Sequence, residues 1–102
     1  MSKVSWTHAA RRDLVDVLDF LVNQNEQAAR NFIQILEQKE SLYASSPALG
    51  SVYPELSGSL RSFVVKSYVL FYREESNGIT IVRLIHAARD ISALLEENSD
   101  IK

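Results

Sequence analysis

Basic side chains gather in the second half of the sequence, on or beside the segments predicted as strands. They are Arg61, Arg73, Arg83, His86 and Arg89. Alternation along a strand puts three of these arginines among apolar neighbours. A guanidinium grips a phosphate or a carboxylate through two parallel N–H donors, so converging arginines would form an anion site. An unpaired buried charge is costly, and the alternative for each arginine is a structural salt bridge to Asp13, Asp16 or Glu55.

His86 ends the last predicted strand, and two roles are open to it. A neutral imidazole could act as a general base. It could equally cap the strand end through a backbone carbonyl. The sheet face of Arg83 is also open, because a slip of one residue in strand register reverses the direction of every side chain.

Composition removes several classes of function. The 102 residues include no cysteine, which excludes a disulfide framework, a thiolate metal site and a cysteine nucleophile. His8 and His86 are far apart, and neither has ligand-like spacing with carboxylates. The three glycines fit no phosphate-binding loop. A net charge of −2 argues against a dedicated nucleic-acid binder. The sequence therefore predicts no metal, no cofactor and no specific DNA binding by this chain alone.

The first half is predicted to hold a short strand and two helices. The strand covers Lys3 to Trp6, and a helix from His8 to about Gln24 follows, with Thr7 as its N-cap. Asn25 is predicted to cap a second helix, from about Glu26 to Ser45. So short a link makes the two helices an antiparallel hairpin.

After an irregular connection over Pro47 to Ser59, the period changes from 3.6 to 2. Three strands are predicted, over 60–65, 68–74 and 79–86, with an Asn77-Gly78 type I′ turn before the third. The side expected to face the helices consists of Phe63, Val65, Val69, Phe71, Val82 and Leu84. A short helix over Ile91 to Glu97 and a mobile acidic tail are expected to follow.

The predicted fold is therefore α+β: a strand, a helix hairpin, a three-stranded antiparallel meander and a short C-terminal helix. Residues 1–102 are expected to form a single domain. No apolar run approaches the roughly 20 residues that cross a bilayer, and the N-terminus has no apolar signal-peptide core. The protein is expected to be soluble and cytoplasmic, without a membrane partner.

Several short motifs follow one another in a set order between about residues 3 and 95. They are Val4-Ser5-Trp6 with Ala10 and Asp13-Leu14, Asn25 to Phe32 with Ala28-Ala29, Pro47-Ala48-Leu49-Gly50, Leu60-Arg61, Tyr68-Val69-Leu70-Phe71-Tyr72-Arg73, and Ile81-Val82-Arg83-Leu84-Ile85-His86-Ala87-Ala88-Arg89-Asp90. In order and spacing they resemble the ParE branch of the RelE/ParE toxins of bacterial type II toxin–antitoxin modules, which stabilise plasmids. The final His-x-x-Arg-Asp is the most telling match.

The resemblance implies one of two activities on one fold. RelE-type toxins cut mRNA on the ribosome, whereas ParE-type toxins poison DNA gyrase. Arg61, Arg83 and His86 match positions where the nuclease branch often has reactive groups. The tyrosine that nucleases carry after the last strand is replaced by Ala87 and Ala88, and residues 49–59 contain no lysine or arginine.

A gyrase poison that acts by binding, without enzymatic activity, is therefore the favoured interpretation. Its target-binding residues are predicted to be Arg61, Arg83, His86 and Arg89, with the tail after Ile91 as a further contact. A ribosome-dependent endoribonuclease and a non-toxic orphan interaction module are the alternatives.

The resemblance also implies a ParD-like antitoxin with a DNA-binding N-terminal domain and a C-terminal segment that folds on the toxin. An amphipathic helix could dock on apolar surface of the helices and sheet. The candidate antitoxin-binding residues are Arg11, Arg12, Leu18, Phe20, Leu36, Tyr43 and Arg73. The alternative is that the apolar members of this set complete the core.

Overall fold

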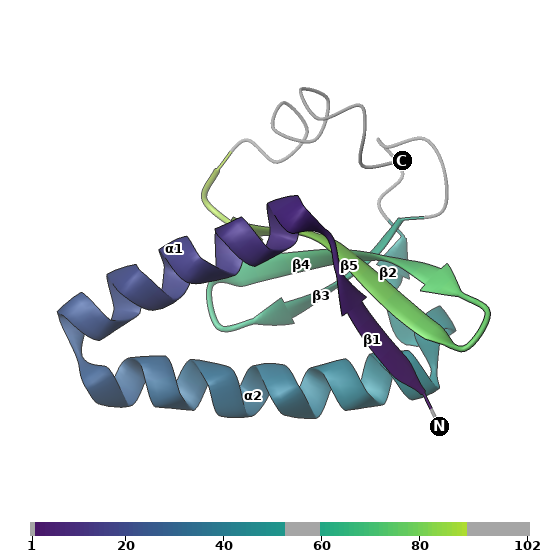
Figure 1. Ribbon diagram of the computed structural model, residues 1–102, viewed down its shortest axis with the longest axis horizontal. Helices are drawn as coiled ribbons and strands as arrows, with labels where there is room; N and C mark the ends of the chain where they lie inside the picture. The colour runs from purple at the N-terminus through teal and green to yellow at the C-terminus, as the bar shows by residue number, and fades with distance from the viewer. Residues whose placement is uncertain (1, 53–59, 90–102) are drawn as a thin grey trace.

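The computed structural model describes residues 2–52 and 60–89, in which two helices cover one face of a five-stranded sheet (Figure 1). The elements are β1 (Lys3–Trp6), α1 (His8–Gln24), α2 (Glu26–Ser45), the 3₁₀ helix η1 (Pro47–Leu49), β2 (Ser51–Val52), β3 (Arg61–Val65), β4 (Tyr68–Glu75) and β5 (Gly78–His86). The α+β class and the order of strand, helix hairpin and meander are confirmed. The helix expected over residues 91–97 lies outside the described residues.

The predicted helix boundaries are confirmed, and hydrogen bonds from polar side chains explain them. The hydroxyl of Thr7 accepts from the Ala10 N–H at 3.1 Å. Asn25 ends α1 and begins α2: its own N–H donates to the Leu21 carbonyl, and its side chain accepts from the Gln27 N–H at 2.7 Å. One residue therefore serves both helices, which enforces the antiparallel hairpin.

The sheet has the strand order β1-β5-β4-β3-β2, and β1 pairs with β5 in parallel. Lys3 pairs with Gly78 and Trp6 with Ile81, so the two ends of the described chain meet in the sheet. The Thr7 hydroxyl extends the contact by donating to the Val82 carbonyl at 2.9 Å. Figure 1 shows β1 crossing beside β5, where it leads into α1. This long-range pairing fixes α1 over β5.

The turn between β4 and β5 differs from the type I′ turn that was predicted at Asn77-Gly78. Glu75 pairs with Gly78, so the two turn residues are Ser76 and Asn77, and Asn77 does not have a positive φ. Gly78 is needed for another reason. A Cβ atom on Gly78 would lie 1.8 Å from the Lys3 carbonyl oxygen, because β1 passes directly over this position.

Replacing Gly78 by alanine is therefore expected to push β1 away from β5. We expect the free energy of unfolding to fall by roughly 1–3 kcal/mol, the usual cost of overpacking. Urea denaturation followed by circular dichroism measures this change. The matched control is Ser76→Ala at the exposed turn, where a change within about 0.5 kcal/mol is expected. Equal stability of the two variants would contradict the close approach.

The helix-facing side of β4 is the opposite of the one expected. Tyr68, Leu70 and Tyr72 join the core under the helices, whereas the side predicted to be inward, with Val69 and Phe71, faces the other way. The cause is the two-residue link between β3 and β4. Val65 pairs with Tyr68 across this link, so the two side chains share a face. Phe63, Val65 and Leu84 do belong to the core, as expected.

A β-bulge at Val82 decides the direction of Arg83. Phe71 pairs with Arg83 and Tyr72 pairs with Ile81, which leaves Val82 as an extra residue in β5. The expected grouping of Arg83 with Ile79 and Ile81 is therefore wrong. Ile81 and Leu84 both face the helices, and Arg83 emerges beyond the end of β1.

The connection after α2 is more ordered than predicted. Its first part forms η1 and the short strand β2, whose Ser51 and Val52 pair with Ser62 and Arg61. Two residues are too short for alternation to be visible in the sequence. None of the helices in the described ranges is long and apolar enough to span a bilayer.

A half-buried carboxyl links α2 to β1. The indole N–H of Trp6 donates to Glu40 at 2.7 Å. Burial raises the pKa of Glu40; the Trp6 hydrogen bond opposes this rise and the charge of Glu37 adds to it. A pKa that is raised on folding stabilises the protein below the unfolded value, and this contribution is lost as the pH rises through the folded pKa.

Glu40→Gln is expected to remove this pH dependence. Relative to the glutamine variant, the native protein loses stability as the pH rises from about 4.5, by less than about 1 kcal/mol because the group is partly exposed. Urea unfolding of both proteins between acidic and neutral pH measures the difference. A gap between the two curves that is constant with pH would contradict the shift.

Candidate functional site

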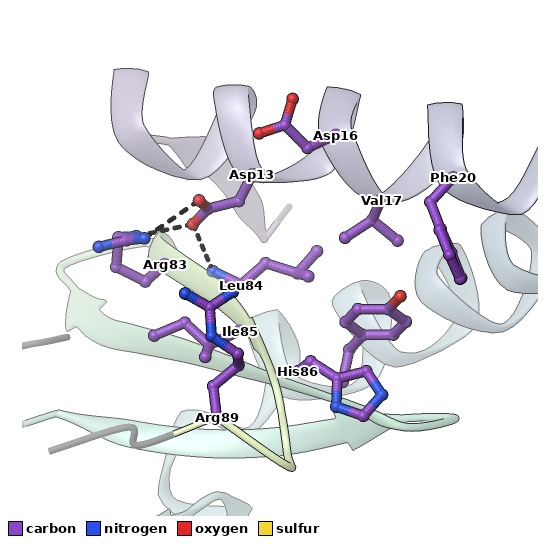
Figure 2. A pocket seen from close by; sticks show the side chains of 10 residues that line it. Asp13, Asp16, Val17, Phe20, Arg83, Leu84, Ile85, His86 and Arg89 are labelled. Atoms are coloured by element: carbon purple, nitrogen blue, oxygen red, sulfur yellow. Dashed lines mark hydrogen bonds and ion pairs between the residues drawn. The ribbon is translucent and has the colours of Figure 1, made fainter. Parts of the chain in front are cut away.

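A shallow pocket of about 240 Å³ lies between α1 and the end of β5. We call it the charged pocket; Asp13, Asp16, Arg83, His86 and Arg89 line it. Figure 2 shows Asp13, Val17 and Phe20 extending from α1 toward the stretch of β5 that holds Leu84, Ile85 and His86. The pocket thus joins three of the four residues predicted to bind a target: Arg83, His86 and Arg89.

Asp13 and Arg83 form a two-pronged ion pair at one wall of this pocket. Arg83 Nε lies 2.7 Å from Asp13 Oδ2, and Nη2 lies 3.1 Å from Oδ1. Oδ2 also accepts from the Leu84 backbone N–H at 2.9 Å. The side chains are only 14% and 17% exposed. The salt-bridge alternative for Arg83 is thus confirmed, with Asp13 as the partner, and most of its charge is already balanced within the protein.

His86 lies exposed at the end of β5 with one ring nitrogen engaged. Nδ1 accepts from the Ala88 N–H at 3.0 Å, so the neutral ring carries its proton on Nε2. The ring meets that of Tyr68 edge-on, with centroids 5.0 Å apart. His86 does cap the strand end, but by accepting from an N–H and not through a carbonyl. In this arrangement its free nitrogen is a donor, which is unsuited to taking a proton from a substrate.

Arg61 lies away from the charged pocket. Its Nη1 donates to the Gly50 carbonyl at 3.0 Å and more weakly to the Ala48 carbonyl at 3.4 Å. Arg61 begins β3, whereas the pocket lies at the other end of the meander, where Val65 pairs with Tyr68 and Tyr68 with His86. Four residues of strand separate the two ends, about 13 Å. The predicted set of basic residues therefore does not converge on one point.

The charges that line the pocket are balanced in sign. Asp13 is opposed by Arg83, and Asp16 has Arg89 among its neighbours in the lining. Within residues 2–52 and 60–89, no group of histidine and acidic side chains is placed to hold a metal ion. This arrangement favours a polar binding surface for a protein more than a site for a highly charged phosphate.

The residues predicted to bind an antitoxin differ widely in exposure. Leu36 is only 4% exposed and lies in the core, so the core alternative describes it. Leu18 and Tyr43 pack partly buried against the core, and Tyr43 stacks on Phe63 at 4.6 Å. Phe20 is 55% exposed.

The three arginines of that set are also distinct. Arg11 and Arg12 are exposed on α1, whereas Arg73 is half-buried on β4 and pairs with Glu75 at 3.1 Å.

Sequence reasoning missed Tyr68 as part of the pocket, because tyrosines were assigned to the core or its rim. It also missed the link from Lys39, whose Nζ donates to the Val64 carbonyl at 2.5 Å. Lys39 was noted only as a charged residue in an apolar stripe. A lone lysine within such a stripe is a signal for an interaction of this kind, since a buried cation needs an acceptor.

Comparisons with known proteins agree with this architecture. A search of curated proteins gives no match. Among solved structures, one described as "Chromosomal ParDE TA system from P. aeruginosa" is similar, with a TM-score of 0.67 and 19% identity over 84% of this chain and 96% of the other. At that identity the similarity concerns the fold. The family described as "ParE toxin of type II toxin-antitoxin system, parDE" matches residues 4–91. The chain therefore belongs to the ParE toxin family of type II toxin–antitoxin systems.

Proposed function

We propose that this chain is a toxin that poisons DNA gyrase by binding it and that a ParD-like antitoxin neutralises it. The observation that carries the proposal is the ParE family match over residues 4–91, because ParE toxins pair with ParD antitoxins in the ParDE system. The charged pocket, with His86 and Arg89 exposed at its edge, is the proposed target-binding surface.

The chemistry of the pocket supports binding over catalysis. Ribonuclease attack by a 2′-hydroxyl needs a base and positive charge around the phosphorane. His86 Nδ1 is already engaged by the Ala88 N–H, and the charge of Arg83 is balanced by Asp13. Only Arg89 is left in the pocket as an arginine without an ion pair among residues 2–52 and 60–89.

The exposed imidazole of His86 is the one observation that favours the ribonuclease alternative. It would have to release the Ala88 N–H, or shift its proton between ring nitrogens, before acting as a base. The gyrase experiment therefore has a ribosome experiment as its counterpart.

The test is a supercoiling reaction with purified gyrase, ATP, relaxed plasmid and this protein. Linear DNA that accumulates after detergent and protease treatment is the expected result, because a poison traps the cleaved intermediate. A ParD-type antitoxin added in excess should abolish it. Folded protein that leaves gyrase unaffected but cuts mRNA on translating ribosomes would replace the proposal with the nuclease. Inactivity in both reactions would favour an orphan interaction module.

A further inference from the structure

A second pocket, of about 290 Å³, adjoins the charged pocket where the helix hairpin extends past the turn between β3 and β4. We call it the apolar pocket. Leu21 of α1 and Ala28 and Phe32 of α2 supply apolar lining, and Asn31, Lys66 and Ser67 supply polar lining. The side chain of Phe32 is 1% exposed and forms part of the core beneath.

The two pockets share three aromatic side chains. Phe20, Tyr68 and His86 line both. The Tyr68 ring meets the His86 ring edge-on at 5.0 Å and the Phe32 ring edge-on at 5.5 Å, so the three rings form a continuous row. A group that enters the apolar pocket therefore contacts the same rings that a target contacts at His86. Phe20, exposed and placed between the pockets, gives such a group an aromatic surface.

The charge at the rim indicates what kind of group fits. Lys66 is the only lysine, arginine or acidic residue among the described residues that line the apolar pocket. It is exposed at the turn, next to Ser67. An apolar side chain with a carboxylate nearby matches this lining, because the ring row takes the apolar part and Lys66 the charge. An amphipathic acidic segment has this chemistry.

We propose that the antitoxin seats an apolar side chain in the apolar pocket, with a carboxylate toward Lys66, and thereby covers His86. Antitoxin and target then compete for one surface, and neutralisation needs no change in the shape of the toxin. The proposal rests on the proposed function, since it names how the target-binding surface is blocked.

The absence of cysteine in the chain allows a direct test. Asn31→Cys places one thiol at the rim of the apolar pocket, where N-phenylmaleimide adds an aromatic group. Gln38→Cys, on the exposed side of α2, is the matched control. We compare labelled with unlabelled protein for each variant. The label at residue 31 is expected to lower gyrase poisoning by at least about tenfold, and the label at residue 38 to leave it within about twofold.

The second arm uses the complex with a co-expressed ParD-type antitoxin. The antitoxin is expected to slow labelling of Cys at position 31 by at least about tenfold while position 38 stays reactive. Lys66→Glu should weaken antitoxin binding by about tenfold and Arg30→Glu, an exposed charge reversal on α2, much less.

The outcomes separate the two proposals. Full poisoning by protein labelled at residue 31, or a residue 31 thiol that stays reactive in the complex, would overturn the competition and leave the proposed function intact. Unlabelled, folded protein that does not poison gyrase would overturn the proposed function and the competition with it.

Discussion

Replacing Asp13 by alanine is expected to lower the free energy of unfolding by about 3 kcal/mol, the cost of leaving a buried charge without its partner. Asp13 is the acceptor for two donors of Arg83 and for the Leu84 backbone N–H. Its removal leaves the guanidinium and this N–H unsatisfied in a place shielded from water. Urea denaturation at neutral pH measures the loss.

Two variants make the Asp13 experiment specific. Asp13→Asn keeps an oxygen for the Leu84 N–H but loses the charge, so an intermediate loss is expected. Glu26→Ala removes an ion pair to Arg30 of similar length, 3.0 Å, whose side chains are mostly exposed. That control should change stability by no more than about 0.5 kcal/mol. Equal losses for Asp13→Ala and Glu26→Ala would show that shielding from water is unimportant at this pair.

The second large effect concerns the target. The double substitution His86→Ala and Arg89→Ala is expected to reduce gyrase poisoning by at least about tenfold, because it removes the two exposed polar side chains from one end of the charged pocket. The readout is the concentration of protein that gives half-maximal linear DNA. Folding should be little affected, since neither side chain is part of the core.

Arg30→Ala is the control for charge, because it removes an exposed cation from α2. It should poison gyrase like the unaltered protein. A double variant that is folded and fully active would place the target-binding surface elsewhere on the chain.

The helices were predictable because their signals are local. Thr7 and Asn25 are capping residues directly before apolar-periodic segments, and the structure begins both helices there. The face of β4 needed one further step: Lys66 and Ser67 form a two-residue link, which fixes Tyr68 opposite Val65. Apolar residues on both sides of β4, such as Leu70 and Phe71, hid this direction from alternation alone.

The candidate site was harder to predict because it depends on long-range pairing. The bulge at Val82 has no signature in the sequence, yet it sets the direction of Arg83. Asp13 was one of three possible partners for Arg83, and only the docking of α1 over β5 selects it. Arg61 could not be separated from the other basic residues without the sheet order.

The parallel pairing of β1 with β5 has a consequence for how the chain folds. Lys3 waits for Gly78, and Asp13 for Arg83, so both contacts close loops of about 70 residues or more. The helix hairpin and the β3–β4–β5 meander need only neighbouring segments and should form early, whereas closing such long loops is slow. A freshly synthesised chain is therefore expected to acquire its charged pocket last, and the rate at which toxin becomes active is set by the docking of its own N-terminus.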